Sequence, residues 1–477
     1  GTPPPRNAWR NHVRGFGGMV TAQVLLLVLP LGILTAHAWL VPNCAPLEGL
    51  MFFLLIPCLT AVFITALGML CAALFRSWGA YVALAGALLL LLLHPVLQIL
   101  TQPQLYAYNH LFGTFTGFSW DETQPVFGTL AIYRVLTLAW SGAVLSAAFA
   151  VSRQGRETLR GGHGRRIVLS LFAVSSAMAI LGVLYSDDLG FSTSAQALQK
   201  ALAETRHTEH FVIRCARGAF SRRELNAMAD EHEFRLAQVC RDLGVRWEGR
   251  ISSYVYPDNR VKRRLLGTET SQIARPWMRE IHLSREGWRD ALKHEIVHVV
   301  ASAFGPYLVR TPVFRAFGLT EGLAMAVEWD AGNRTPHQLA AAMLAQGMLP
   351  QASRIISTGG FLTGASFSGY VASGSFCRWL IDVKGLAVMK DAYARDDVET
   401  ATGLSLERLD GEWRGFLGTV QREMPDSATT VWLFRRQSLF TKACPRAVTE
   451  QNREAVAAVA AGDDARAVRL FLEADAM

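Results

Sequence analysis

Long apolar runs are absent after residue 190 of this 477-residue chain, although 51% of its residues are hydrophobic. The apolarity is concentrated before that point, in five segments nearly free of charge and each long enough to cross a bilayer as a helix. These are residues 17–41, 50–75, 78–100, 127–151 and 167–185. A cleaved signal peptide accounts for only one such stretch, so we expect a membrane domain over residues 1–190.

Lysine and arginine are absent from the first and third loops between these segments. The net charge of +8 comes mostly from residues 1–185. The arginines between the apolar segments lie in the N-terminal tail, the second loop and the fourth loop. This alternation follows the positive-inside rule and predicts a cytoplasmic N-terminus, with the soluble domain on the opposite side. It also argues against nucleic acid as a partner.

Two features of the membrane domain are unusual. Arg134 lies eight residues into the fourth segment; we expect it to snorkel to the outer interface, unless that helix begins later. Loop 101–126 is rich in aromatic residues and glycine, which predicts an interfacial aromatic belt or, alternatively, a surface that docks the soluble domain or a substrate. Its polar residues His110, Asp121 and Glu122 lack metal-ligand spacing.

The chain has only seven cysteines. Cys58 and Cys71 lie inside the second apolar segment, where we expect them to pack as small apolar residues. Four more follow the membrane domain, and an even number there allows either two disulfides or buried free thiols. These are Cys215, Cys240, Cys377 and Cys444.

The soluble part begins with mixed α/β patterning. Residues 210–216, 250–258 and 280–284 read as strands, and residues 221–244 read as a helix with Ser221 and Glu224 in a capping box. The pattern of residues 287–304 predicts a second helix. Further helices follow, at 320–329 with Thr320 as its cap, at 337–347 and at 369–385.

The tail, residues 453–476, predicts two short amphipathic helices around Gly462 and resembles a single tetratricopeptide repeat. One such repeat cannot bury its own apolar face. We therefore expect that the hairpin docks on the preceding domain, that the chain continues past Met477, or that the hairpin binds a protein partner.

The sequence HEIVH, within residues 291–305, is a candidate metal-binding motif. His294 and His298 are one helical turn apart on one face, where both imidazoles can reach one metal ion, and Glu295 lies beside them as a general base. Glu321, in the sequence TEGLA, is a candidate third ligand. The alternative for HEIVH is a chance match to the pattern. The alternative for Glu321 is an acidic residue favoured at a helix N-terminus by the helix dipole.

HEIVH followed by TEGLA resembles the gluzincins, which are zinc metallopeptidases with two His and one Glu as ligands, and most closely the bacterial peptidase MA-like group. The resemblance covers residues of about 207–420. It implies Zn²⁺ bound by His294, His298 and Glu321, and an oxyanion-stabilising tyrosine at Tyr370, with Tyr307 as a competitor. Thermolysin-like members carry an aspartate one turn after the ligand glutamate; Met325 stands there, so the residue that orients the zinc-bound histidine is unidentified.

We thus expect a multi-domain protein. An all-α polytopic membrane domain (1–190) precedes an α+β zincin-like metallopeptidase domain (200–425) and a short α-hairpin tail (426–477). The resemblance implies a multi-pass protein of the bacterial inner membrane whose periplasmic domain hydrolyses peptide or protein substrates at the membrane or envelope.

Two other functions are considered. A protease acting within the bilayer is excluded because charged residues directly precede the motif, so that helix is not in lipid. A non-catalytic, membrane-held scaffold with a degenerate or structural zinc site is the alternative. The charged residues are Arg285, Glu286, Arg289, Asp290 and Lys293.

Overall fold

The structure is a computed structural model, and its described residues divide into two compact units. The first unit comprises 1–198, 263–268 and 446–477, and the second comprises 199–262 and 269–445. Each unit is considered by itself. The residues that the structure describes are 8–41, 44–115, 128–160, 162–306, 309–329, 334–364, 366–420, 427–434 and 444–476.

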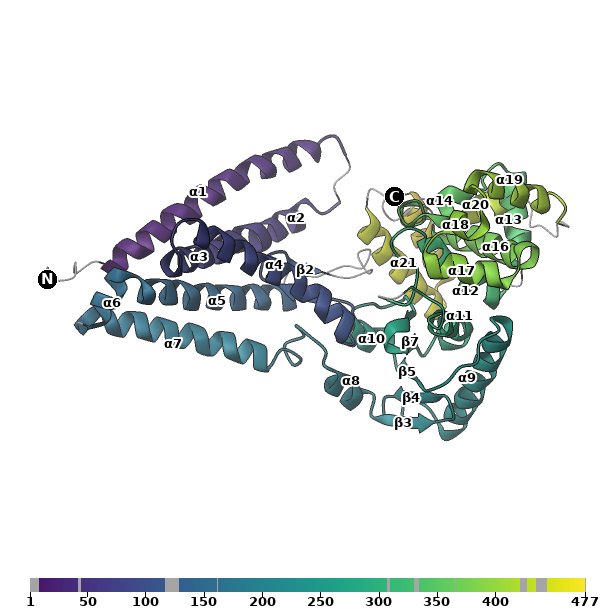
Figure 1. Cartoon of the computed structure of the whole chain (residues 1–477), viewed down its shortest axis with the longest axis horizontal. Helices are drawn as coiled ribbons and strands as arrows, with labels where there is room; N and C mark the ends of the chain where they lie inside the picture. The colour runs from purple at the N-terminus through teal and green to yellow at the C-terminus, as the bar shows by residue number, and fades with distance from the viewer. Residues whose placement is uncertain are drawn as a thin grey trace. The chain divides into compact units, whose positions relative to one another are not determined.

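Five helical segments of the first unit are long and apolar enough to cross a membrane, as the sequence predicts. The second of them combines α2, a π-helical turn (Leu54–Cys58) and α3. The elements are α1 (Ala8–His37), α2 (Pro46–Phe53), α3 (Leu59–Leu74), α4 (Trp78–Thr101), β1 (Ala107–Asn109), β2 (Gly113–Phe115), α5 (Thr129–Val151), α6 (Arg153–Arg160), α7 (Gly162–Leu184), α8 (Ala195–Ala201), α21 (Pro445–Ala460) and α22 (Asp464–Ala476) (Figure 1).

The Arg134 side chain is buried rather than extended toward solvent, so it does not snorkel, and α5 begins at Thr129, two residues later than the expected segment. Helix α5 packs between α3 and α7, and the Arg134 side chain on α5 is fully buried. Its guanidinium donates to the carbonyls of Leu55 (2.7 Å) and Ile56 (2.8 Å) in the π-helical turn and to Thr60 Oγ1 (2.8 Å). A π turn interrupts the regular hydrogen-bond ladder, so its carbonyls can accept from a side chain. Local backbone geometry therefore solvates the buried cation.

The third loop contains a small antiparallel hairpin, β1–β2, rather than only a belt of side chains. His110 lies at its turn, stacks on Tyr133 at 4.9 Å and shares a hydrogen bond of 3.0 Å with Thr137. Its carbonyl accepts a hydrogen bond from Arg134 (3.1 Å). His110 is therefore a packing residue of the first unit. Asp121 and Glu122 lie outside the described residues.

The cysteines follow the free-thiol alternative at three of the four soluble positions. Cys215, Cys240 and Cys377 are free thiols, of which Cys215 and Cys377 are buried, so two disulfides among those four cysteines are excluded. Cys58 and Cys71 are also free. Cys44 and Cys444 are each disulfide-bonded.

The second unit is built on a five-stranded mixed sheet of order β3-β4-β5-β7-β6. Strands β4, β5 and β7 are parallel, whereas β3 and β6 run antiparallel at the edges. Helices α9 (Arg222–Asp242) and α11 (Trp288–Ala301) contribute apolar side chains to the core of this sheet. The strands are β3 (Glu204–His207), β4 (Phe211–Cys215), β5 (Ile251–Tyr256), β6 (Ile273–Arg275) and β7 (Glu280–Ser284).

Helices dominate the rest of this unit. The Ser221–Glu224 capping box is present on α9, with both hydrogen bonds formed. Thr320 is not a cap: α12 begins three residues earlier, after Ala316, and the Thr320 hydroxyl donates to Pro312 O (2.7 Å). The remaining helices are α10 (Asn259–Leu266), α12 (Phe317–Glu328), α13 (Pro336–Ala345), α14 (Ala352–Ile356), α15 (Thr358–Thr363), α16 (Ser366–Lys384), α17 (Leu386–Arg395), α18 (Val398–Thr402), α19 (Leu406–Leu417) and α20 (Ser427–Phe434).

Candidate metal centre

Helix α11 carries the two histidines of HEIVH. Its apolar residues Leu292, Ile296, Val299 and Val300 are fully buried, which fixes the rotation of the helix about its axis. The four-residue spacing then places the His294 and His298 rings next to one another, with centroids 4.9 Å apart.

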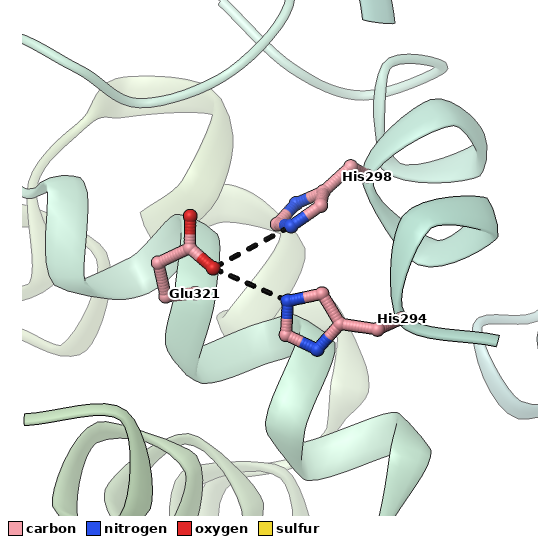
Figure 2. Close-up of side chains that lie close together, drawn as sticks. All are labelled: His294, His298 and Glu321. Carbon is pink, nitrogen blue, oxygen red and sulfur yellow. Dashed lines mark hydrogen bonds and ion pairs between the residues drawn. The ribbon is translucent and has the colours of Figure 1, made fainter. Parts of the chain in front are cut away.

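Glu321 on α12 faces both histidines, as Figure 2 shows. Its Oε2 lies 3.2 Å from His294 Nε2 and 3.5 Å from His298 Nε2. One ligand atom from each residue lies within 4.8 Å of the others. Two imidazole nitrogens and one carboxylate oxygen therefore converge on a single point, and the three residues form a group that could hold a metal ion.

The histidines and carboxylates of this group shift one another's pKa values. Burial lowers the pKa of His294, but hydrogen bonds to Glu321 and Glu328 outweigh that effect and hold it well above its usual value. Burial would raise the pKa of Glu321, yet the neighbouring histidines hold it well below its usual range. The carboxylate is thus ionised, which is the form that a metal ion requires.

The other ring nitrogen of His294 has a carboxylate partner that the sequence did not reveal. His294 Nδ1 lies 3.0 Å from Glu328 Oε2. Glu328 follows Glu321 by seven residues, two turns of α12, so both side chains share one face. Met325, one turn after Glu321, carries no carboxylate and packs against α16 beside Gly374. A carboxylate on the second nitrogen fixes the tautomer and ring orientation of a ligand histidine.

Side chains from elsewhere in the second unit bind the backbone at both ends of α12: Asp396, directly after α17 (Leu386–Arg395), and Lys293 of α11. Asp396 accepts hydrogen bonds from the backbone N–H groups of Phe314, Arg315 and Ala316, at 2.7–3.1 Å, directly before the helix. At the other end, Lys293 Nζ donates to Val327 O (2.6 Å). The contacts with Ala316 and Val327 satisfy backbone groups that a helix leaves unpaired at its termini, and those with Phe314 and Arg315 hold the segment that leads into it. They fix α12, and with it Glu321, relative to α11.

Helix α12 also lies unusually close to α16. A Cβ atom on Gly322 would lie 2.6 Å from Cys377 Sγ and 2.8 Å from Ser373 O, and one on Gly374 would lie 2.5 Å from Met325 Cβ. Only glycine allows backbones to approach this closely. The approach places Tyr370 of α16 near the histidines, with its ring 6.4 Å from that of His294.

Glu295 and Tyr370 both adjoin the three-residue group. Burial raises the pKa of Glu295, while the charges of His298 and His294 oppose that shift. Burial, together with the charges of Glu321 and Glu295, holds the pKa of Tyr370 well above its usual value, so the phenol stays protonated. Tyr307, the competing tyrosine, lies outside the described residues.

The five residues singled out from the sequence therefore come together, and Glu328, Asp396 and Lys293 are additions. Comparison of the chain with protein-family models, curated proteins and solved structures finds no match. The functional argument accordingly rests on the geometry of these side chains.

We predict that the purified full-length protein binds one divalent metal ion per chain at this group. Replacing both histidines, His294→Ala with His298→Ala, removes two of the three ligands and should lower the metal content to background. Elemental analysis of the protein in detergent measures it. His210→Ala, which alters a histidine paired with Glu233 away from the group, is the control and should retain the metal. Full metal content in the double variant would contradict the assignment.

Glu328→Ala should weaken metal binding without abolishing it. Loss of a carboxylate that orients a ligand histidine typically costs about 10–100-fold in affinity. Competition with a chromogenic chelator gives the affinity, and Glu328→Gln, which keeps an acceptor oxygen, should recover part of the loss. The control is Glu412→Ala, which removes an acid of α19 that is paired with Lys384 of α16. Parent-like affinity in Glu328→Ala would show that the contact has no orienting role.

Proposed function

We propose that this chain is a membrane-anchored zinc metallopeptidase that hydrolyses peptide bonds on the extracytoplasmic side. The observation that carries the proposal is the convergence of His294, His298 and Glu321, with Glu295 and Tyr370 beside them. Atoms bound about 2.1 Å from a tetrahedral zinc lie roughly 3.4 Å apart. The separations of 3.2 and 3.5 Å between the carboxylate oxygen and the two imidazole nitrogens fit that arrangement.

Zinc held by these residues would supply Lewis-acid activation of a water molecule and of the scissile carbonyl. Glu295 accepts the proton of the attacking water and delivers it to the leaving amine; its raised pKa brings the group closer to the working pH, as a general base requires. Tyr370, kept protonated, donates a hydrogen bond to the oxyanion that develops in the transition state. Glu328 holds the imidazole of His294 in a fixed orientation.

The alternative is a non-catalytic scaffold with a structural metal site. Structural zinc sites are usually closed by four protein ligands, whereas catalytic sites use three and leave one position open. Within the described part of the chain, the group contains three residues of ligand type. This count favours the catalytic function over the scaffold.

We further propose that the five apolar helices span the inner membrane of a bacterium, with the N-terminus in the cytoplasm and the second unit in the periplasm. The arginine asymmetry of the loops supports this orientation. The disulfide-bonded state of Cys44, in the first loop, and of Cys444 also supports it, because disulfides persist in oxidising compartments. The bilayer then confines the enzyme to substrates at the membrane or envelope.

Glu295→Gln separates an enzyme from a scaffold. The amide keeps the size of the side chain but cannot take the water proton, so turnover of an unstructured protein substrate should fall by about 10²-fold or more. Metal content should stay at the parent level. A variant that cleaves the substrate as fast as the parent would exclude hydrolysis by this mechanism.

Tyr370→Phe is the companion variant. It should lower kcat more than it raises KM, since the phenol acts mainly on the transition state. Glu233→Gln, which alters a carboxylate of α9 paired with His210, is the control and should turn over like the parent.

The orientation is testable with a reporter enzyme that is active only in the cytoplasm. Fused after residue 200, it should be silent, because the chain has crossed the membrane five times by then. Fused after residue 160, in the arginine-rich fourth loop, the same reporter should be active. A strong signal from the first fusion would reverse the topology.

A further inference from the structure

One end of the first unit concentrates positive charge. The start of α1, the end of α5, the short helix α6 and the start of α7 meet there (Figure 1). They share a small core of Ala8, Phe149 and Val168, against which Leu159 of α6 packs. Seven exposed arginines, the arginine cluster, lie near this core: Arg10, Arg14, Arg153, Arg156, Arg160, Arg165 and Arg166.

Negative charge is scarce around the arginine cluster. Among the described residues of α1, α5, α6 and α7, the one carboxylate is that of Glu157, and it lies 3.7 Å from Arg153 Nε on the same helix. Guanidinium groups held together at one end of a helical bundle repel one another, and a bound anion relieves that repulsion. These four helices therefore do not supply the negative charge that the arginine cluster needs.

The backbone that carries the arginines of α6 is tightly packed. A Cβ atom on Gly155 would lie 1.7 Å from Phe149 O, so α6 lies directly against the end of α5. Ser152 Oγ donates to Phe149 O (2.7 Å) and accepts from the Gly155 N–H (3.0 Å). Arg156 and Arg160 are four residues apart and so share one face of α6. Their guanidinium groups are thus presented together on a fixed turn of the chain.

Apolar surface follows the arginines along two of the helices. Met19 lies five residues after Arg14 on α1, and Ile167 directly follows Arg166 on α7; both apolar side chains are exposed. Trp9, at the start of α1, packs against the shared core, and tryptophan is enriched at the membrane–water interface. A ligand with a negative headgroup and acyl chains matches this order of charged and apolar surface.

We infer that the arginine cluster binds the headgroup of an anionic phospholipid, whose acyl chains lie against the exposed apolar side chains of α1 and α7. A planar guanidinium group donates two parallel hydrogen bonds to a phosphate, which suits arginine to this headgroup. The inference rests on the proposed membrane spans and is independent of the peptidase function.

The lipid has a structural consequence for α1. Of the described residues of α1, Ala8 is the buried one, so this helix has little packing of its own along the bundle. A headgroup shared by Arg14 and the arginines of α6 and α7 would fasten α1 to the other helices at the end where the arginine cluster lies.

Native mass spectrometry of the full chain in a non-ionic detergent measures lipid binding directly. The chain is titrated with dioleoyl phosphatidylglycerol and, separately, with dioleoyl phosphatidylcholine, which has the same acyl chains and a phosphate but no net charge. Phosphatidylglycerol should bind about 25-fold more tightly or better, on the scale of about fivefold for each of two arginines beside an anionic headgroup.

Arg160→Gln and Arg165→Gln alter exposed residues on different helices. Each should weaken phosphatidylglycerol binding about fivefold, and the double variant about 25-fold. Arg160→Lys keeps the charge and should bind more tightly than Arg160→Gln. The matched control is Arg76→Gln, which removes one exposed arginine from the second loop and should bind like the parent. An unchanged size-exclusion profile in detergent reports that each variant keeps its fold.

Equal affinity for the two lipids would overturn the inference. An equal loss in Arg76→Gln would overturn it as well, because the preference would then come from general surface charge. Displacement of the lipid by millimolar glycerol 1-phosphate, which has the phosphate without acyl chains, would assign the cluster to a soluble phosphate, whereas retention of the lipid supports the inference. The reporter fusions test the membrane spans separately, so failure of lipid binding is distinguishable from failure of the topology.

Discussion

The shared contact of Glu321 with two histidines is the constraint on which the second unit depends. A buried carboxylate between two imidazoles is costly unless charges and hydrogen bonds compensate it, and the compensation works only at one separation of α11 and α12. The supporting contacts serve that separation: Lys293 at one end of α12, Asp396 at the other, and the glycine approach to α16. The α/β core fixes α11, so the remaining helices have to fit around it.

The first unit also buries a charged side chain but stabilises it with different partners. Arg134 is a fully buried cation, and the described contacts of its guanidinium are with carbonyls and a hydroxyl. The acceptors come from a π-helical turn and from the β1–β2 hairpin, so irregular backbone is placed where protein surrounds it. In the first unit backbone dipoles stabilise a buried charge, whereas in the second the partners are side chains of opposite sign.

Local patterns allowed much of this architecture to be predicted. The apolar helices, the Ser221 capping box and the four-residue spacing of HEIVH are short-range signals, and each is present in the structure. The misses depend on distant residues. Thr320 has the residue type of a cap, but α12 begins at Phe317, and Asp396, 80 residues away from Ala316, accepts from the N–H groups directly before it. The burial of Arg134 was not expected because no sequence pattern predicts that a π turn lies opposite it.

The glycine contact between α12 and α16 has a consequence for how this protein can change. Because a Cβ atom at Gly322 or Gly374 would clash with the facing helix, α12 and α16 can keep their separation only while both positions stay glycine. Exposed residues outside that contact, such as Leu362, can vary in size without changing this separation. The fold thus separates positions that are free to diversify from positions that are not.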